Sequence, residues 1–356
     1  MADVDEQSRR VVNNPASAGG VGEAGEGARA LEGESGFNEF ESGVEDLIGA
    51  EATFRGAKSA PEVVSKSVRG DGERLGEWVV KDKLQGGGGG EAELFHVRHR
   101  QDRRMGVMKV YRENIRPDVD LLEHLLAEEI SGVVRVWEHG VAGAESDFSG
   151  RYYEVMEECE GHLGSPKYQS AAGREEWVLE LVRQVGEALG AIQKADIVHR
   201  DIKPSNILIR KSEPVEFAVA DFGIAAFAGR GVRAGKKEFS YRYASPSQLA
   251  AGTVDKADDW WSLGMMVCEL LRQQHPFGRE GKDQVLAEYV NRRWRPQAPP
   301  VVSPRWQELL DGLMNYDADR RWGHGETTAW CRQGLKEKAA SAPAAAGLGV
   351  AAGDNF

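Results

Sequence analysis

A short polar segment near the middle of the chain has the residue types and spacing of a phosphoryl-transfer site. Its sequence, HRDIKPSNIL, spans residues 199–208. Asp201 supplies a carboxylate that can accept a hydroxyl proton, and Lys203 supplies a cation that can stabilise a phosphoryl group in transfer. Asn206 adds an amide oxygen of the kind that binds Mg²⁺. A segment in which so many positions carry the residue types that phosphoryl transfer needs is rare by chance. We therefore expect Asp201 and Lys203 to be catalytic.

A second acidic position lies downstream. Asp221-Phe222-Gly223 follows the strand-like residues 217–220, twenty residues after Asp201. At this interval the carboxylate of Asp221 can bind a Mg²⁺ ion that bridges nucleotide phosphates. The sequence therefore predicts Asn206 and Asp221 as metal ligands.

A lysine upstream has the setting of a phosphate-binding residue. Val107-Met108-Lys109 reads as part of a strand, and Lys109 lies fifteen residues after Leu94. A lysine on a strand usually only extends its ammonium into solvent. Here Leu94 follows a glycine-rich turn, and this spacing places the ammonium under the loop that would cover a triphosphate. We therefore expect Lys109 to bind phosphates.

The glycine-rich turn runs from Gly86 to Gly90. Glycine lets backbone N–H groups approach phosphate oxygens, so we expect Gly87 and Gly89 to contact the nucleotide. In the G-x-G-x-x-G pattern, Ala92 takes the third glycine position. A flexible linker is the alternative interpretation of five successive glycines.

Lys109 needs an acidic partner that holds it in position. The next predicted helix spans residues 121–130 and offers Glu123, Glu128 and Glu129. In the pattern LLEHLL, Glu123 is the position that we expect to face inward. The sequence therefore predicts an ion pair between Glu123 and Lys109.

The order of the predicted elements indicates an α+β fold with two lobes. Strand-like segments come first, at 94–98, 106–111, 133–138 and 152–157. Residues 177–193 then carry apolar side chains with a helical period, and residues 260–271 read as a buried apolar helix. This order predicts a small β-rich N-terminal lobe and a larger helical C-terminal lobe.

The composition excludes some classes of function. The 356 residues carry a formal net charge of −12. Because binding to nucleic-acid backbones needs a basic surface, we expect no nucleic-acid partner. No apolar run approaches the ~18 residues that cross a bilayer, so we expect no membrane span. The hydrophobic content of 41% is sufficient for a real core.

The start of the chain and its cysteines suggest a location. The first residues, MADVDEQSRR, lack a basic segment followed by an apolar stretch, so we expect no secretory signal. Cys159, Cys268 and Cys331 are odd in number and too far apart for a CxxC pair. Reduced thiols in a cytoplasmic protein are the simplest interpretation.

Both ends of the chain differ from the middle. Residues 1–75 contain 15 acidic and 8 basic residues, and we expect most of this arm to be disordered. Apolar residues from Phe37 to Ile48 recur at helical steps. They indicate either a short helix that docks on the folded part or on a partner, or chance within a tail. Residues 337–356 read as an Ala/Gly-rich tail.

On these motifs, residues 76–336 resemble a bacterial-type (Hanks-type) serine/threonine protein kinase domain. Residues 259–264 have the D-x-W-S-x-G pattern of its large lobe, and Lys203 two positions after the aspartate is typical of the serine/threonine class. The resemblance implies an N-lobe of about 76–158 and a C-lobe of about 159–336. It also implies that residues 199–208 form the catalytic loop and that Asp259 braces the backbone of this loop.

The resemblance further implies the reaction and the nucleotide pocket. The γ-phosphoryl group of ATP would pass to serine or threonine hydroxyls of protein substrates, with Mg²⁺, or alternatively Mn²⁺, as the metal. Met156 would be the gatekeeper beside the adenine, and the backbone of Glu157 and Cys159 would bind the adenine edge. The other residues implied to line the pocket are Leu94, Val107 and Leu208.

The A-P-E element of the family reads Ser245-Pro246-Ser247 here. In the family, its glutamate pairs with an arginine near the end of the domain, a role that falls to Arg321. Removing one partner of a buried ion pair costs about 3–5 kcal/mol unless the site is rebuilt. We therefore expect Arg321 to find another acceptor or solvent.

The segment after Gly223 is also unusual. It contains no Ser, Thr or Tyr before Ser240 and carries Arg230, Arg233, Lys236 and Lys237 instead. The resemblance implies that Ser240 contacts Asp201 and Lys203, so phosphorylation of Ser240 should block activity. We expect basal activity without a phosphate in this segment, controlled by the acidic arm docking on it.

Three alternatives differ in activity. A pseudokinase scaffold without turnover is favoured by Ala92, by Ser247 and by the segment that cannot be phosphorylated. A small-molecule kinase such as an aminoglycoside phosphotransferase is disfavoured by Lys203 and the D-x-W-S-x-G pattern. An interaction hub built on the acidic arm is compatible with kinase activity. The sequence predicts no particular oligomeric state.

Overall fold

The computed structural model describes residues 72–84, 90–169, 175–228, 240–251, 255–278, 280–291 and 294–341. All of them belong to the unit Lys66–Phe356. Several predictions lie outside the described residues: those for Gly87 and Gly89, for residues 1–71 with their short helix, for the basic residues in 229–239, and for the tail beyond 341.

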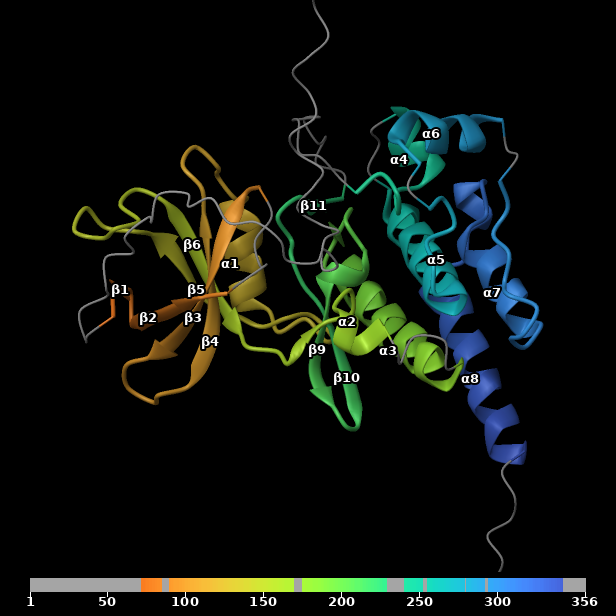
Figure 1. Ribbon diagram of the computed structural model, residues 1–356, viewed down its shortest axis with the longest axis horizontal. Coiled ribbons are helices and arrows are strands. Elements are labelled where there is room, and N and C mark those ends of the chain that lie inside the picture. The colour runs from red at the N-terminus through yellow and green to blue at the C-terminus, as the bar shows by residue number, and fades with distance from the viewer. Residues whose placement is uncertain are drawn as a thin grey trace, which may run out of the picture. The chain divides into compact units, whose positions relative to one another are not determined.

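The N-terminal lobe is a six-stranded antiparallel sheet with one helix (Figure 1). Its strands are β1 (Arg74–Leu75), β2 (Trp78–Lys83), β3 (Ala92–His99), β4 (Met105–Tyr111), β5 (Val136–Val141) and β6 (Tyr152–Glu157). Their order in the sheet is β1-β2-β3-β4-β6-β5. The helix α1 (Val119–Ala127) lies between β4 and β5 in the chain and packs against β5.

Alternation along the strands gives the sheet two different faces. Met108 and Val110 on β4 are fully buried in the apolar cluster of this lobe. Because successive strand residues point to opposite sides, Val107 and Lys109 lie on the other face. That second face bears the polar residues of the candidate site.

Helix α1 is capped and placed by its own sequence. The side chain of Asp118 accepts a hydrogen bond from Leu121 N at 3.2 Å, which caps the first turn. Leu121, Leu122 and Leu125 form the buried face of the helix. Leu121 and Leu125 belong to the large apolar core, so apolar packing holds α1 in place.

The C-terminal lobe consists mainly of helices. They are α2 (Pro166–Gln169), α3 (Glu175–Lys194), α4 (Pro246–Ala251), α5 (Lys256–Arg272), α6 (Lys282–Val290), α7 (Arg305–Leu313) and α8 (His324–Ser341), with the 3₁₀ turns η2 (Pro204–Asn206) and η3 (Ala318–Arg320). Short strands β7 (Gly161–His162), β9 (Ile207–Ser212) and β10 (Val215–Val219) form a sheet in the order β10-β9-β7. Strand β8 (Ile197–Val198) pairs with β11 (Ala226–Phe227).

Helices α3 and α5 form the centre of the core. Figure 1 shows α5 beside α7, and α8 running alongside α3. The predicted helical period of α3 is confirmed, because its apolar stripe from Val178 to Ile192 is buried. Helix α5 begins with a capping box between Asp255 and Asp258 and is buried over nearly its whole length, as predicted for residues 260–271.

The predicted α+β fold with two lobes is confirmed. Within the described residues, regular structure runs from Arg74 to Ser341, slightly beyond both limits of the domain predicted at 76–336. Within the ranges that the structure describes, no helix has both the length and the apolar character needed to cross a bilayer.

Candidate active site

Lys109 and Asp221 form the ion pair at the centre of the site. Lys109 Nζ lies 2.7 Å from Asp221 Oδ1 and 3.6 Å from Glu154 Oε1. The side chain of Lys109 is 11% exposed, whereas that of Asp221 is 45% exposed and so remains accessible to a ligand. The structure thus brings together the two residues for which the sequence predicted phosphate and metal binding.

Opposite charges keep both groups ionised at neutral pH. Burial works to lower the pKa of the Lys109 ammonium, but the carboxylates of Asp221 and Glu154 outweigh it and raise that pKa. Desolvation works to raise the pKa of Asp221, yet the charge of Lys109 holds it at about 2. Lys109 is therefore a cation at neutral pH, which suits it to bind phosphate.

The strand register explains why Lys109 points into the site. Lys109 on β4 pairs with Leu94 on β3 and with Glu154 on β6, and Val107 pairs with Met156. Directly paired residues present their side chains on the same face of a sheet. These five residues therefore share the face opposite the apolar cluster.

The prediction that Glu123 pairs with Lys109 is wrong. Glu123 lies on the exposed side of α1, whose buried face consists of leucines. A helix turns by about 100° per residue, so the residue two positions after the buried Leu121 points away from the core. Leu121, Leu122 and Leu125 form that inward face, and Glu123 is not part of it.

Glu154 on β6 supplies the second carboxylate beside Lys109 and was not predicted. Its neighbours Tyr153 and Val155 belong to the apolar cluster, so strand alternation turns Glu154 toward Lys109. Glu154 is only 6% exposed. The alternation in YYEVME indicates which face of the sheet Glu154 takes, whereas its pairing with Lys109 depends on the strand register.

The residues of the catalytic loop are joined by short polar contacts. Asp201 Oδ2 lies 2.8 Å from Lys203 Nζ and accepts a hydrogen bond from Asn206 Nδ2 at 3.0 Å. Asn206 Nδ2 also donates to the Asp201 carbonyl at 2.8 Å. The 3₁₀ turn η2 folds the chain back between these positions. The predicted catalytic residues and one predicted metal ligand therefore form a single cluster.

Ser240 contacts the same cluster from the far end of the following segment. Its backbone N–H donates to Asp201 Oδ1 at 3.2 Å, and its hydroxyl accepts a hydrogen bond from Lys203 Nζ at 2.9 Å. These are the contacts that the resemblance implied for Ser240. Both carboxylate oxygens of Asp201 are thereby held by hydrogen-bond donors.

Buried polar groups hold the backbone of the catalytic loop from behind. Asp259 on α5 accepts hydrogen bonds from His199 N and Arg200 N, each at 2.8 Å, as the resemblance implied. Burial raises the pKa of Asp259 to about 6. His199 Nε2 lies 3.0 Å from Ala220 O, and its Nδ1 accepts a hydrogen bond from Asp201 N at 3.3 Å. One neutral tautomer of the imidazole satisfies both contacts.

Two residues of the site have left-handed backbones. The φ angles of Arg200 and Asp221 are 71° and 65°. Residues with a Cβ adopt this conformation at a cost, and the surrounding structure must enforce it. The hydrogen bond from Arg200 N to Asp259 does so for one, and a hydrogen bond from Gly223 N to Asp221 Oδ1 at 3.3 Å does so for the other.

Asn206 and Asp221 are suitable ligands for Mg²⁺. The backbone carbonyl of Asn206 accepts a hydrogen bond from Ala220 N at 2.9 Å, which links Asn206 to the residue next to Asp221. Mg²⁺ prefers oxygen ligands and often binds through one or two protein groups together with phosphates. Among the described residues, no group of three or more His, Cys, Asp or Glu could hold a metal ion alone. The donor set therefore fits a cation shared with a nucleotide.

The segment that joins the lobes is anchored by Glu157. Its Oε1 accepts hydrogen bonds from Arg210 Nε at 2.8 Å and from Arg210 Nη2 at 2.6 Å. Arg135 N donates to the same oxygen at 2.9 Å. Because Arg210 belongs to β9, this contact ties the end of β6 to the C-terminal lobe.

The other predicted nucleotide contacts are partly buried. Leu94, Val107, Met156 and Leu208 are each half-buried, and Leu208 alternates with the fully buried Ile207 and Ile209 on β9. Cys159 is also half-buried, and burial raises the pKa of its thiol to about 12, so the thiol is neutral. Contact of these residues with adenine stays a prediction.

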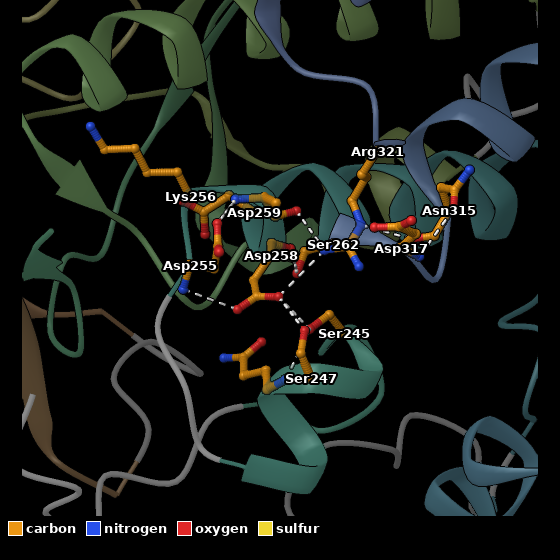
Figure 2. Close-up of polar contacts among 12 residues, drawn as sticks. Ser245, Ser247, Asp255, Lys256, Asp258, Asp259, Ser262, Asn315, Asp317 and Arg321 are labelled. Carbon is orange, nitrogen blue, oxygen red and sulfur yellow. Dashed lines mark hydrogen bonds and ion pairs between the residues drawn. The ribbon is translucent and has the colours of Figure 1, made fainter. Parts of the chain in front are cut away.

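Arg321 has a carboxylate partner on α5. Asp258 Oδ1 accepts hydrogen bonds from Ser245 Oγ at 2.5 Å and Ser247 Oγ at 2.8 Å, and Arg321 Nη1 lies 3.4 Å away. Figure 2 shows Asp258 between the two serines and Arg321. Arg321 also donates to the backbone carbonyls of Ala257 and Asn315. The prediction that Arg321 finds another acceptor is confirmed.

Comparison with known proteins agrees with this geometry. The family model described as the protein kinase domain matches residues 80–334 of the chain. Serine/threonine-protein kinase unc-51 of Caenorhabditis elegans is 35% identical over 179 residues, which are 48% of this chain and 21% of the relative. Serine/threonine-protein kinase PknA of Mycobacterium tuberculosis is 28% identical over 251 residues, 67% of this chain and 56% of the relative.

A second bacterial relative gives a similar match. Serine/threonine-protein kinases PknA of Corynebacterium glutamicum is 32% identical over 157 residues, which are 44% of this chain and 33% of that protein. The matched part of this chain spans only about a fifth to a little over half of the length of these curated relatives.

Proposed function

Because this chain belongs to the protein kinase domain family, we propose that it transfers the γ-phosphoryl group of ATP to serine or threonine hydroxyls of protein substrates. One observation carries the proposal: Lys109 reaches Asp221 from the sheet, while Asp201, Lys203 and Asn206 are joined on the adjoining loop. The serine/threonine class is supported by Lys203 and by the names of the relatives.

Asp201 orients the substrate hydroxyl and accepts its proton as the oxygen attacks the γ-phosphorus and the bond from that phosphorus to the ADP oxygen breaks, so that ADP leaves. Asn206 Nδ2 and Ser240 N each hold one of the Asp201 oxygens, so the carboxylate is oriented before substrate arrives. Lys203 lies 2.8 Å from Asp201 Oδ2 and stabilises negative charge on the transferred phosphoryl oxygens.

The remaining residues hold the nucleotide. Lys109 binds the α- and β-phosphates, the backbone N–H groups of Gly87 and Gly89 contact the same phosphates, and Asn206 and Asp221 would hold Mg²⁺. When bound, the metal neutralises phosphate charge. The face of the sheet that carries Lys109 receives the adenine, and the backbone of the segment after β6 binds the adenine edge. The side chains in contact with the base are Leu94, Val107, Met156 and Leu208, and the backbone groups belong to Glu157 and Cys159.

The proposal is tested with radiolabelled ATP, Mg²⁺ and dephosphorylated casein as a generic acceptor. The wild type should label casein on serine and threonine. Asp201→Ala should abolish labelling while retaining binding of a fluorescent ATP analogue, and Lys109→Met should lose labelling by misplacing the phosphates. Glu216→Gln, at an exposed position on β10, is the matched control. A wild type that binds the analogue but labels nothing would be the pseudokinase.

We also propose how the chain is located and regulated. All three cysteines are free thiols, which supports a reducing, cytoplasmic compartment. The acidic arm 1–75 is complementary in charge to the basic segment before Ser240, which supports docking of the arm on that segment. Alkylation of the thiols in cells lysed directly into denaturant tests the first proposal, because the denaturant exposes the buried Cys268 and Cys331 and disulfide-bonded cysteines would not react.

A further inference from the structure

The carboxylate beside Lys109 belongs to a strand and is fixed there by the sheet. Glu154 and Lys109 are direct partners in the register of β6 and β4. Glu154 Oε1 lies 3.6 Å from Lys109 Nζ, and the Glu154 side chain is 8% exposed. A carboxylate buried to this degree needs charged and hydrogen-bonding partners. Lys109 is the charged one.

Tyr111 is the hydrogen-bonding partner that orients Glu154. Its hydroxyl donates to Glu154 Oε1 at 3.0 Å, and its ring centre lies 5.0 Å from Lys109 Nζ. Burial and the nearby Glu154 raise the pKa of Tyr111, so the hydroxyl remains a proton donor. Tyr111 lies two residues after Lys109 on the same strand, so all three groups share one face of the sheet.

Helix α1 does not supply this charge. Its buried positions are leucines, and the acidic residues Asp120 and Glu123 within it, like Glu128 and Glu129 after it, are exposed. Glu129 instead forms an ion pair with Arg135. Within the described residues, the carboxylates in ion-pair distance of Lys109 are Glu154 and Asp221.

Asp221 alone cannot balance the charge of the Lys109 ammonium when a nucleotide is bound. Asp221 is a proposed metal ligand, and its charge is then shared with the cation. Glu154 is buried and lies on the sheet, so its interaction with Lys109 does not depend on the metal. Glu154 therefore pairs with Lys109 whether or not the metal is bound, whereas Asp221 is shared with the metal, although both carboxylates contact the same ammonium in this structure.

We propose that Glu154 is the positioning residue of the active site, which, together with Tyr111, holds Lys109 in place for phosphate binding. This inference rests on the proposed function. It has a regulatory consequence: both Glu154 and Lys109 belong to neighbouring strands, so the ion pair persists wherever α1 lies. Displacement of α1 therefore does not switch this enzyme off by breaking that pair.

The first measurement compares steady-state kinetics of Glu154→Gln with those of Glu123→Gln in the full chain. Glu154→Gln should lower kcat/KM for ATP on the order of 100-fold, the size of effect expected from misplacing a positioned group by about 1 Å. Glu123→Gln, on the exposed side of α1, should remain within about twofold of wild type. Equal behaviour of the two variants would overturn the proposal.

Tyr111→Phe tests the same contact with a smaller change, in case Glu154→Gln fails to fold. It removes only the hydroxyl and should lower kcat/KM for ATP in the same direction by about tenfold, as expected for a hydrogen bond to a charged group. Thermal unfolding of each variant accompanies the kinetics. A Tyr111→Phe enzyme with wild-type kcat/KM would contradict the orienting role of the hydroxyl.

A second readout does not require turnover. The affinity of the full chain for a fluorescent ATP analogue reports whether Lys109 is in place to bind phosphates. Glu154→Gln should weaken this affinity, whereas Glu123→Gln should leave it unchanged. Unchanged affinity in Glu154→Gln would refute the positioning role. A wild type that binds the analogue but shows no phosphotransfer would refute only the proposed function.

Discussion

Arg321 and Asp258 form a buried ion pair, with Nη1 3.4 Å from Oδ1 and side chains only 1% and 2% exposed. The carboxylate comes from the first turn of α5, and it also accepts hydrogen bonds from the Ser245 and Ser247 hydroxyls. The segment that precedes α5 is thus fastened to the helical core by serines, and the negative charge required by Arg321 is supplied by the helix.

Asp258→Ala should destabilise the protein by about 3–5 kcal/mol, because it leaves the Arg321 guanidinium buried without a counter-charge. Denaturation in urea, followed by tryptophan fluorescence, measures the loss. Ser247→Ala removes only a neutral hydroxyl and should cost about 1 kcal/mol. Equal losses for the two variants would show that the charge of Asp258 is not what stabilises the site.

Adding Ser247→Glu to the Asp258→Ala variant should restore part of the lost stability. The new carboxylate lies at a position that already contacts the Asp258 side chain, so it can return a negative charge to Arg321. In the wild-type background the same Ser247→Glu change should destabilise, because it places two carboxylates together. The sign of the effect must therefore reverse between the two backgrounds in the same urea experiment.

Ser240→Ala should lower kcat by about tenfold, because Lys203 loses the hydroxyl that accepts its hydrogen bond at 2.9 Å. Ser240→Thr keeps a hydroxyl and should retain most of the activity. Ser240→Asp should abolish transfer, because a carboxylate there competes for Lys203 and repels Asp201. Casein labelling measures all three. An active Ser240→Asp enzyme would contradict the expectation that phosphorylation of Ser240 blocks the site.

The pKa of Asp259 should appear in the pH dependence of stability. It is about 6 in the folded protein against a reference value of 3.8, so the folded state binds this proton more tightly. Its stabilising contribution is complete below pH 3.8 and is lost as the pH rises through about 6. Relative to Asp259→Asn, the unfolding free energy of the wild type should fall between pH 4 and 6. Parallel curves over this range would exclude the effect.

Deletion of residues 1–70 should change the rate of casein labelling or the affinity for casein, because it removes acidic residues proposed to dock on the basic segment before Ser240. The effect should weaken with added salt, as charge screening requires. A matched variant that replaces the acidic residues of the arm with neutral amides should behave like the deletion. Identical kinetics of deleted and full chains would remove the docking hypothesis.

The sequence by itself determined the features that depend on neighbouring residues. The segment 199–208 places Asp201, Lys203 and Asn206 within one loop, so their spacing alone predicted a cluster. The helical period of α3 and the apolar run of α5 reported their burial directly, because each helix carries its own buried face in its sequence. The two-lobed fold followed from the order of such elements.

Only the tertiary structure decided which partner each buried charge takes. Lys109 pairs with Glu154 across two adjacent strands, and Arg321 pairs with Asp258 across two helical segments. The separations in sequence contain no information on which carboxylate comes close, since that depends on strand register and helix packing. Glu123 was the plausible partner by position along the chain, but the rotation of α1 about its axis places it in solvent.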